Sequence, residues 1–458
     1  MSIAGAYVHM KNATEVLLGL AASVMSAMAV SSPDSAGNDP KGPRVRRHAR
    51  DLYKLPRSAA LSQLHQAAES VAPANFPPES IFSPKALWAW LRAYLAYVFR
   101  KKHDFPPHTA SPENAIYDLL DEHGNDAVRI ALAGDWGTGT DEAERVADQM
   151  KAFLPHFTIH IGDVYYVGDA PSVNENCLGI RNSNNNYAPV TWPIGSRGSF
   201  ALNGNHEMYA NGGGYFDVLL PELGLSEGGK MLGQQTSFFC LQNNYWRIIA
   251  IDTGYNSNGL PILGQIPLIN KIPGVGGDCK LPADLMDWLT NVVLREPDQR
   301  GVVVMSHHQY YSGFEDRFPR PARQLWDAGI QQQILWFWGH EHRLAGYDLG
   351  GSEKLQAYGR CVGHGGMPLE PKAPKKSPTP TFYDQRQGVK DEGDMRTGPV
   401  GYGVNGHVNL AFQGPQLTAT YVDLTGDPIL TETWRADGQG AVQYVSGKRL
   451  ISDPDFHA

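Results

Sequence analysis

Carboxylate, amide and imidazole side chains recur in five short motifs between residues 134 and 342. Carboxylate oxygens suit hard cations, imidazole suits zinc, iron and other borderline metals, and one carboxylate can bridge two ions. The combination favours a site for two metal ions a few ångströms apart. In chain order the motifs are Gly134-Asp135-Trp136-Gly137, Gly162-Asp163-Val164-Tyr165-Tyr166, Gly204-Asn205-His206-Glu207, Ser306-His307-His308 and Gly339-His340-Glu341-His342.

Each motif taken alone has a plainer interpretation. An aspartate beside a glycine is usually a turn residue, and paired histidines after a strand are often buried packing. The last motif is more specific, because His340 and His342, two residues apart at a strand end, can both reach a metal cluster. Five motifs in order, all with metal-compatible side chains, are not what chance turns produce, so together they indicate a site.

The motifs need elements that bring them together. From residue 127 short apolar runs alternate with helical stretches, which predicts an α/β arrangement with a helix at 141–154. Each motif directly follows one of the expected strands. Ligands of open α/β sheets gather at the carboxyl ends of the strands, so motifs far apart in sequence are expected to meet. The strands are expected at 128–133, 157–161, 199–202, 236–241, 246–251, 301–306 and 333–338.

The order of these motifs resembles the calcineurin-like metallophosphoesterase superfamily over about residues 125–345. That family's pattern is Asp-x-His or Asp-x-Gly, Gly-Asp, Gly-Asn-His-Asp/Glu, His, and Gly-His-x-His. Two details resemble its purple acid phosphatase-like branch: Gly137 stands where most members have a metal-binding histidine, and Tyr166 stands where that branch has a tyrosine on a ferric ion. The resemblance implies a four-layer αββα sandwich of two mixed β-sheets, in the α/β (α+β) class.

The resemblance also implies a ligand set and a pair of ions. His307 is favoured over His308 because the family's ligand lies five residues before a serine, and Ser312 fits that spacing. The implied ions are Fe(III) and a divalent zinc, manganese or iron ion. One metal would be held by Asp135, Asp163, Tyr166 and His342, and the other by Asp163 as the bridge with Asn205, His307 and His340.

The implied activity is that of a phosphoric ester hydrolase, and an acid phosphatase-like phosphomonoesterase is the first expectation. Two metals would clamp a phosphate oxygen and lower the pKa of bound water, so that metal-bound hydroxide attacks phosphorus in line. Asp163 and His206 are the catalytic candidates, with His206 assisting the leaving group; indirect support of the site is the alternative for His206. A phosphodiesterase acting on nucleotide, glycerophospho or other small diesters is the enzymatic alternative, and an idle phosphate-binding module is the non-enzyme alternative.

Candidates for substrate binding beyond His206 are His308, Arg317 and His364. Arg317 belongs to a stretch where plant-type purple acid phosphatases carry further histidines, which predicts different substrate recognition here. Loop arginines are usually only solvated, and a structural loop histidine is the plainer interpretation of His364.

The composition limits the partners. Lys and Arg number 39 against 47 Asp and Glu in 458 residues, a formal charge of -8, so no basic field for nucleic acid exists and none is expected as a partner. A small-molecule phosphate ester held by a local site is expected instead. Of the four cysteines, Cys177 and Cys279 could pair in an exported protein, but ordinary buried thiols are favoured.

Residues 1–125 are expected to form an N-terminal helical extension with a linker at 31–44 and helices at about 50–71 and 84–101. No run of 18 uncharged apolar residues occurs, so a transmembrane helix is not expected. The aromatic face of 84–101 is expected to pack on the protein, with peripheral membrane contact as the alternative. Residues 16–25 imitate a signal peptide, but Glu15 and the lone Lys11 favour a cytoplasmic location over export.

The catalytic domain is expected to span 126–440, followed by a C-terminal tail at 441–458. Strands near 406–412, 417–423 and 429–434 would complete the second sheet, and 368–400 reads as a long loop.

Overall fold

The computed structural model describes residues 96–97, 100–181, 188–259, 276–296, 298–369, 371–388 and 402–458. The signal-like segment, the linker, the helix expected at 50–71 and most of the one expected at 84–101 lie outside these residues. Within the described part of the chain, no helix is long and apolar enough to cross a membrane.

Two mixed sheets of nine strands each form the centre of the fold. In the first sheet β8, β9, β10 and β12 run parallel, and the outer pairs are mostly antiparallel. Its strand order is β1 (Ile116–Asp118), β7 (Phe239–Gln242), β8 (Trp246–Ala250), β9 (Gly301–Ser306), β10 (Ile334–Trp338), β12 (Ala357–Val362), β11 (Leu344–Gly350), β13 (Phe382–Asp384) and β18 (Phe456–His457).

The second sheet joins a parallel part to an antiparallel part. Strands β2, β3 and β4 are parallel neighbours, and β14 to β17 form an antiparallel series that joins β2 through β14. Its order is β17 (Val442–Arg449), β16 (Pro428–Ala436), β15 (Gln416–Asp423), β14 (Gly406–Gln413), β2 (Val128–Ala133), β3 (Phe157–His160), β4 (Gly198–Ala201), β5 (Gly224–Glu227) and β6 (Lys230–Met231).

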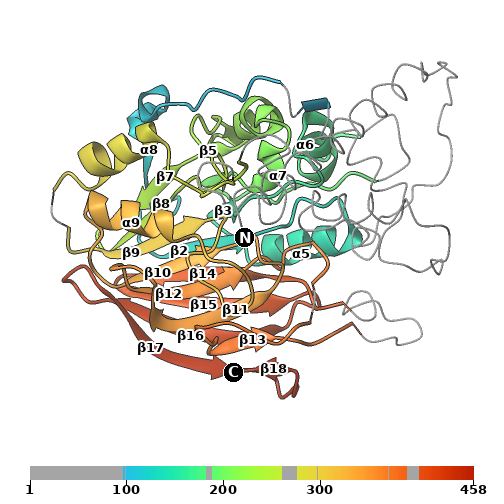
Figure 1. The fold of residues 1–458 in the computed structure, drawn as a ribbon, viewed down its shortest axis with the longest axis vertical. Helices are drawn as coiled ribbons and strands as arrows, with labels where there is room; N and C mark the ends of the chain where they lie inside the picture. Colours follow the sequence, from blue (N-terminus) through green and yellow to red (C-terminus); the bar gives the residue numbers. More distant parts are fainter. Residues whose placement is uncertain are drawn as a thin grey trace, which may run out of the picture. The chain divides into compact units, whose positions relative to one another are not determined.

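Helices cover both outer faces of the sheets. Longer helices and short single-turn elements alternate with the strands (Figure 1). They are η1 (His108–Ala110), η2 (Pro112–Ala115), α5 (Asp141–Ala152), α6 (Ala170–Asn176), α7 (Asn205–Met208), η3 (Tyr215–Leu219), η4 (Leu220–Glu222), α8 (Ala283–Trp288), η6 (Leu289–Val293) and α9 (Pro319–Ala328).

Three hydrophobic clusters define the layers. The first lies between the sheets and joins residues of both, such as Ile130 of β2 and Val303 of β9. The second packs α8 and α9 on the outer face of the first sheet, and the third packs α5 and α6 on the outer face of the second. The expected four-layer αββα sandwich is therefore confirmed.

Local sequence explains the elements nearest the motifs. Strand β2 is a nearly continuous apolar run that is buried on both faces, as a central strand between two packed layers requires. Helix α5 begins after Thr140, whose side chain accepts the Ala143 N–H, and its first turn carries three acidic residues that favour the helix N-terminus.

Several expectations for the chain ends and loops need correction. The segment 441–458, expected as a tail, carries β17 and β18, which pair with β16 and β13. Strand β1 lies within the expected helical extension and pairs in parallel with β7. Strand β13 interrupts the loop expected at 368–400. Cys177 and Cys279 are both free and buried, as are the other two cysteines, so the plainer interpretation holds.

Candidate metal centre

The predicted motifs converge at the carboxyl ends of adjacent strands from both sheets. Strands β2, β3 and β4 are neighbours in the second sheet, and β9 and β10 are neighbours in the first. The side chains that meet come from Asp135 after β2, Asp163 after β3, Asn205 at the start of α7, His307 after β9, and His340 and His342 after β10.

Asp163 lies at the centre of this group. Its Oδ1 is 3.2 Å from Nε2 of His307, and the same oxygen accepts the backbone N–H of His206 at 3.0 Å. Its Oδ2 accepts the hydroxyl of Tyr165 at 3.2 Å. The two carboxylate oxygens therefore face two different donor sets, as a bridging ligand must.

The first donor set surrounds the Tyr165 hydroxyl. This hydroxyl donates to Oδ1 of Asp135 at 2.8 Å and lies 2.9 Å from Nε2 of His342. His342 Nε2 is 3.4 Å from the same oxygen of Asp135. Two carboxylates, a phenol and an imidazole thus point at one small volume.

The second donor set surrounds Oδ1 of Asn205. This oxygen is 2.9 Å from Nδ1 of His340 and 3.2 Å from Nε2 of His307. The opposite ring nitrogen of His307, Nδ1, lies 2.8 Å from the carbonyl of Ile161, to which it can donate. That bond fixes the ring and leaves Nε2 for a ligand.

The donor chemistry fits a cation between these groups. If Nδ1 of His307 donates to Ile161, its Nε2 faces the acceptor oxygens of Asp163 and Asn205 and needs a proton or a cation there. Burial alone would lower the pKa of His307, but Asp163 and Asp135 outweigh it and raise that pKa to about 10. A proton and a metal ion therefore compete for one position.

The pKa values of Asp135 and Asp163 also depend on burial and on neighbouring charges that oppose it. Burial and the neighbouring Asp163 raise the pKa of Asp135 to about 6, although His307 opposes this. Burial also acts to raise the pKa of Asp163, but His307 and His206 hold it well below its usual value. Buried acidic groups so close together require positive charge, which bound cations would supply.

Three residues of the site have a left-handed backbone conformation. Asp135, Asp163 and His340 have φ values of 56°, 74° and 65°. Left-handed conformations at non-glycine residues cost energy of order 1–3 kcal/mol each, and they cluster at functional sites. Gly204 permits the close approach of chains, because a Cβ at that position would lie 2.1 Å from Oδ1 of Asp163.

His206 lies beside the cluster. Its Nδ1 is 2.5 Å from the carbonyl of Tyr166, so Nδ1–H donates outward and Nε2 lies 3.8 Å from Oδ2 of Asp163. The ring of Tyr165 packs 4.3 Å from its ring. His206 is thus oriented with one nitrogen toward the position a substrate would take.

The structure brings a second tyrosine to the site beside the expected Tyr166. The hydroxyl of Tyr165 lies between Asp135, Asp163 and His342. Tyr165 is buried and Tyr166 is half-buried, and the carbonyl of Tyr166 receives the His206 bond.

The remaining substrate candidates have different surroundings. The His308 ring lies 4.5 Å from that of His340, and one ligand atom each of His307, His308 and His340 lie within 4.8 Å of one another. Arg317 is exposed on the loop before α9. His364 is buried beside Gly406 and His407, which favours the structural interpretation.

Two supporting residues were missed from the sequence. The carboxylate of Glu207 accepts the backbone N–H groups of Gly204 and Asp163 at 3.0 and 3.2 Å. The hydroxyl of Thr253 accepts the backbone N–H of His308 at 3.0 Å and lies 3.1 Å from Nδ1 of the same residue. The signal for Thr253 was available, because it also follows an expected strand.

Comparisons with solved structures found several similar chains. GAP50, the anchor in the inner membrane complex of Plasmodium, is 14% identical over 68% of this chain and 89% of its own, with a TM-score of 0.43. Purple acid phosphatase PPD1 from yellow lupin (Lupinus luteus) seeds is 14% identical over 72% and 54%, with a TM-score of 0.42. PhoD is 12% identical over 72% and 73%, also with a TM-score of 0.42.

A search of curated protein sequences found no match. The family model described as calcineurin-like phosphoesterase matches residues 128–344. This range begins with β2 and ends just after His342, so it contains every residue of both donor sets. Residues 128–344 therefore belong to the calcineurin-like phosphoesterase family, as the order of the motifs predicted.

Proposed function

We propose that this chain is a dinuclear metal-dependent phosphomonoesterase similar to the purple acid phosphatases. The observation that carries the proposal is the carboxylate of Asp163, with one oxygen toward His307 and the other toward Tyr165. The phenol of Tyr165 in the first donor set favours Fe(III) at that position, and the amide and imidazole groups of the second set suit divalent zinc, manganese or iron beside Asn205.

Two bound cations would supply Lewis-acid polarisation of the phosphate and an activated water for in-line attack on phosphorus. The chain supplies the positions. One metal position would be formed by Asp135, Tyr165 and His342, and the other by Asn205, His307 and His340. Asp163 would belong to both.

His206 is proposed as the leaving-group acid. Its Nδ1–H bond to the Tyr166 carbonyl holds the ring, so a proton on Nε2 points toward the substrate side. Donation of that proton to the departing alkoxide is worth roughly 10²–10⁴-fold in rate. No side chain is needed as a nucleophile, so hydrolysis should invert configuration at phosphorus, and retention would contradict direct attack.

His308 is proposed as a phosphate contact. Thr253 holds Nδ1, which leaves Nε2 on the side of His340. The neutral tautomer with Nε2–H would donate to a phosphate oxygen. Arg317 and His364 are further candidates for the same role; the first is exposed and the second is buried.

The test combines metal analysis with paired substrates. The purified protein is assayed with 4-nitrophenyl phosphate and bis(4-nitrophenyl) phosphate after reconstitution with iron, zinc or manganese. We expect two ions per chain and faster hydrolysis of the monoester. Asp163→Asn should abolish turnover, while Asp148→Asn, an exposed aspartate paired with Lys151, should not.

Each outcome tests a different part of the proposal: the ester preference, the identity of the metals, or catalysis itself. Preference for the diester would favour the phosphodiesterase alternative. Two manganese or zinc ions with full activity and no iron would contradict the purple acid phosphatase-like assignment alone. Stoichiometric metal binding without turnover of either ester would favour the idle binding module.

A further inference from the structure

Residues 100–105, here called the strap, cross two loops that adjoin the metal centre. The backbone N–H of His103 donates to the carbonyl of Asn211 at 2.9 Å. In return, the side-chain amide of Asn211 donates to the carbonyls of Tyr97 at 2.5 Å and Arg100 at 3.1 Å. Asn211 has a φ of 58°, a conformation that asparagine tolerates better than most residues.

The strap also holds a second loop. The hydroxyl of Tyr255 donates to the carbonyl of His103 at 2.7 Å. Lys102 places its ammonium 3.4 Å from the centre of the Tyr255 ring and donates to Oδ1 of Asn256 at 3.3 Å. The ring of Phe105 packs edge-on against Tyr255 at 4.9 Å. This loop follows β8, so it belongs to the first sheet.

Both loops form hydrogen bonds with α7, the helix that carries Asn205 and His206. The backbone N–H of Asn211 donates to Met208 at the end of α7, at 3.1 Å. From the other loop, the side-chain amide of Asn258 donates to the carbonyl of Asn205 at 3.1 Å. Because α7 is a single turn of four residues, its own hydrogen bonds fix its position weakly.

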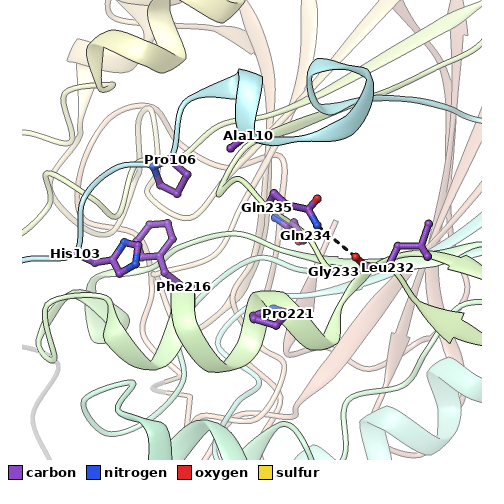
Figure 2. A pocket seen from close by; sticks show the side chains of 9 residues that line it. All are labelled: His103, Pro106, Ala110, Phe216, Pro221, Leu232, Gly233, Gln234 and Gln235. Atoms are coloured by element: carbon purple, nitrogen blue, oxygen red, sulfur yellow. Dashed lines mark hydrogen bonds between the residues drawn. The ribbon is translucent and has the colours of Figure 1, made fainter.

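The contact between strap and loops is concentrated at few residues. The ring of His103 stacks on Phe216 at 4.5 Å with an interplanar angle of 11°. Beyond this stack a cavity of about 410 Å³ is lined by Pro106 and Ala110 on one side and by residues such as Leu232 on another (Figure 2). On the near side of this cavity, His103, Asn211 and Tyr255 each join the strap to the loops through hydrogen bonds.

We propose that the strap positions Asn205 and His206 for the reaction, with Asn211 and Tyr255 as positioning residues that act through α7. The inference rests on the proposed function for its kinetic consequence. Misplacement of a reacting group by about 1 Å can cost on the order of 10²-fold in rate. A leaving-group acid is most sensitive to this when the leaving group is a poor one, because protonation then contributes most to the transition state.

The experiment uses the full-length protein and two single substitutions. Asn211→Gly keeps the positive φ but removes the side-chain bonds to the carbonyls of Tyr97 and Arg100, and Tyr255→Phe removes only one hydroxyl. Lys101→Ala is the matched control, since its ion pair with Asp104 is exposed and touches neither loop. The first readout is kcat for an alkyl phosphate relative to kcat for 4-nitrophenyl phosphate.

We expect both substitutions to lower kcat for the alkyl ester by about tenfold and kcat for the aryl ester by less than about threefold. KM should change little, and Lys101→Ala should match the wild type. Equal losses for the two esters, or none, would overturn the positioning role, because a merely structural role changes stability and not the dependence on the leaving group.

A second readout does not need turnover. Amide hydrogen exchange over residues 205–212 should be faster in Asn211→Gly and Tyr255→Phe than in the wild type and in Lys101→Ala. If the wild type hydrolyses no ester, the proposed function fails while faster exchange still supports the strap. Unchanged exchange in both variants contradicts the strap whether or not the enzyme is active.

Discussion

Replacing Tyr165 by phenylalanine tests which tyrosine binds the metal. The structure places the Tyr165 hydroxyl in the first donor set, whereas the spacing of the sequence motif predicts Tyr166. The Tyr165 hydroxyl lies 2.8, 2.9 and 3.2 Å from atoms of Asp135, His342 and Asp163. Tyr165→Phe removes this one oxygen and keeps the buried ring that packs against His206. Tyr166→Phe is the matched control at the adjacent position.

The expected loss can be bounded from this geometry. Removing a group that only supports a ligand typically costs 10–100-fold in metal affinity. The Tyr165 oxygen is one of four donors directed at one volume, so its loss should cost at least that much. The corresponding free energy is about 1.4–2.7 kcal/mol of binding at this position.

The assay is competition of the metal-free protein against a chromophoric chelator, followed by a visible spectrum of the iron-loaded form. Tyr165→Phe should weaken one of two binding events and abolish a phenolate-to-iron absorption band, while Tyr166→Phe keeps both. If Tyr166→Phe removes the band and Tyr165→Phe does not, the placement of Tyr165 is wrong and the spacing rule is right.

Four further predictions test other parts of the chain. His206→Gln should slow hydrolysis of alkyl phosphates by roughly 10²–10⁴-fold and of aryl phosphates much less, as measured by steady-state kinetics. Glu207→Ala should lower metal affinity by about 10–100-fold in a chelator titration, since its carboxylate holds two backbone N–H groups of the site. Burial lowers the pKa of His407 to about 3 from an ordinary 6.5, so the unfolded chain takes up a proton below pH 6.5 that the folded chain refuses. By pH 5 this removes about 2 kcal/mol of stability, and urea unfolding of His407→Gln should show a correspondingly smaller loss between pH 7 and 5; an identical loss would contradict the linkage. Arg360→Met should destabilise the fold by about 3–5 kcal/mol because it leaves Glu432, bonded at 2.7 Å, buried without its partner, and the double variant with Glu432→Leu should recover most of that loss in urea unfolding.

The central strands and the positions of the motifs were predictable because their signals are local. Continuous apolar runs such as 128–133 identify buried parallel strands, and a polar motif directly after each run marks the carboxyl end. Candidate ligands such as Asp135 and Asp163 need only this rule and a strand order that places β2 and β3 side by side.

The features that sequence could not give depend on contacts between distant segments. Strand β17 is exposed along most of its length and has no apolar alternation, so only its pairing with β16 makes it a strand. Strand β1 has three residues and exists through its pairing with β7. The approach of the Tyr165 hydroxyl to Asp135 and His342 joins segments that lie far apart in the sequence, so residue spacing alone does not show it.

The pairing of β2 with β14 sets the order in which the protein can be completed during synthesis. Strand β2 presents Asp135, yet one of its two neighbours is Gly406–Gln413, near the other end of the chain. At 5–20 residues per second, the ribosome needs roughly tens of seconds to make the intervening chain. Until then this side of β2 is an unpaired edge on the nascent polypeptide, and a truncated product ending before β14 would contain every residue of both donor sets without the strand that pairs with β2.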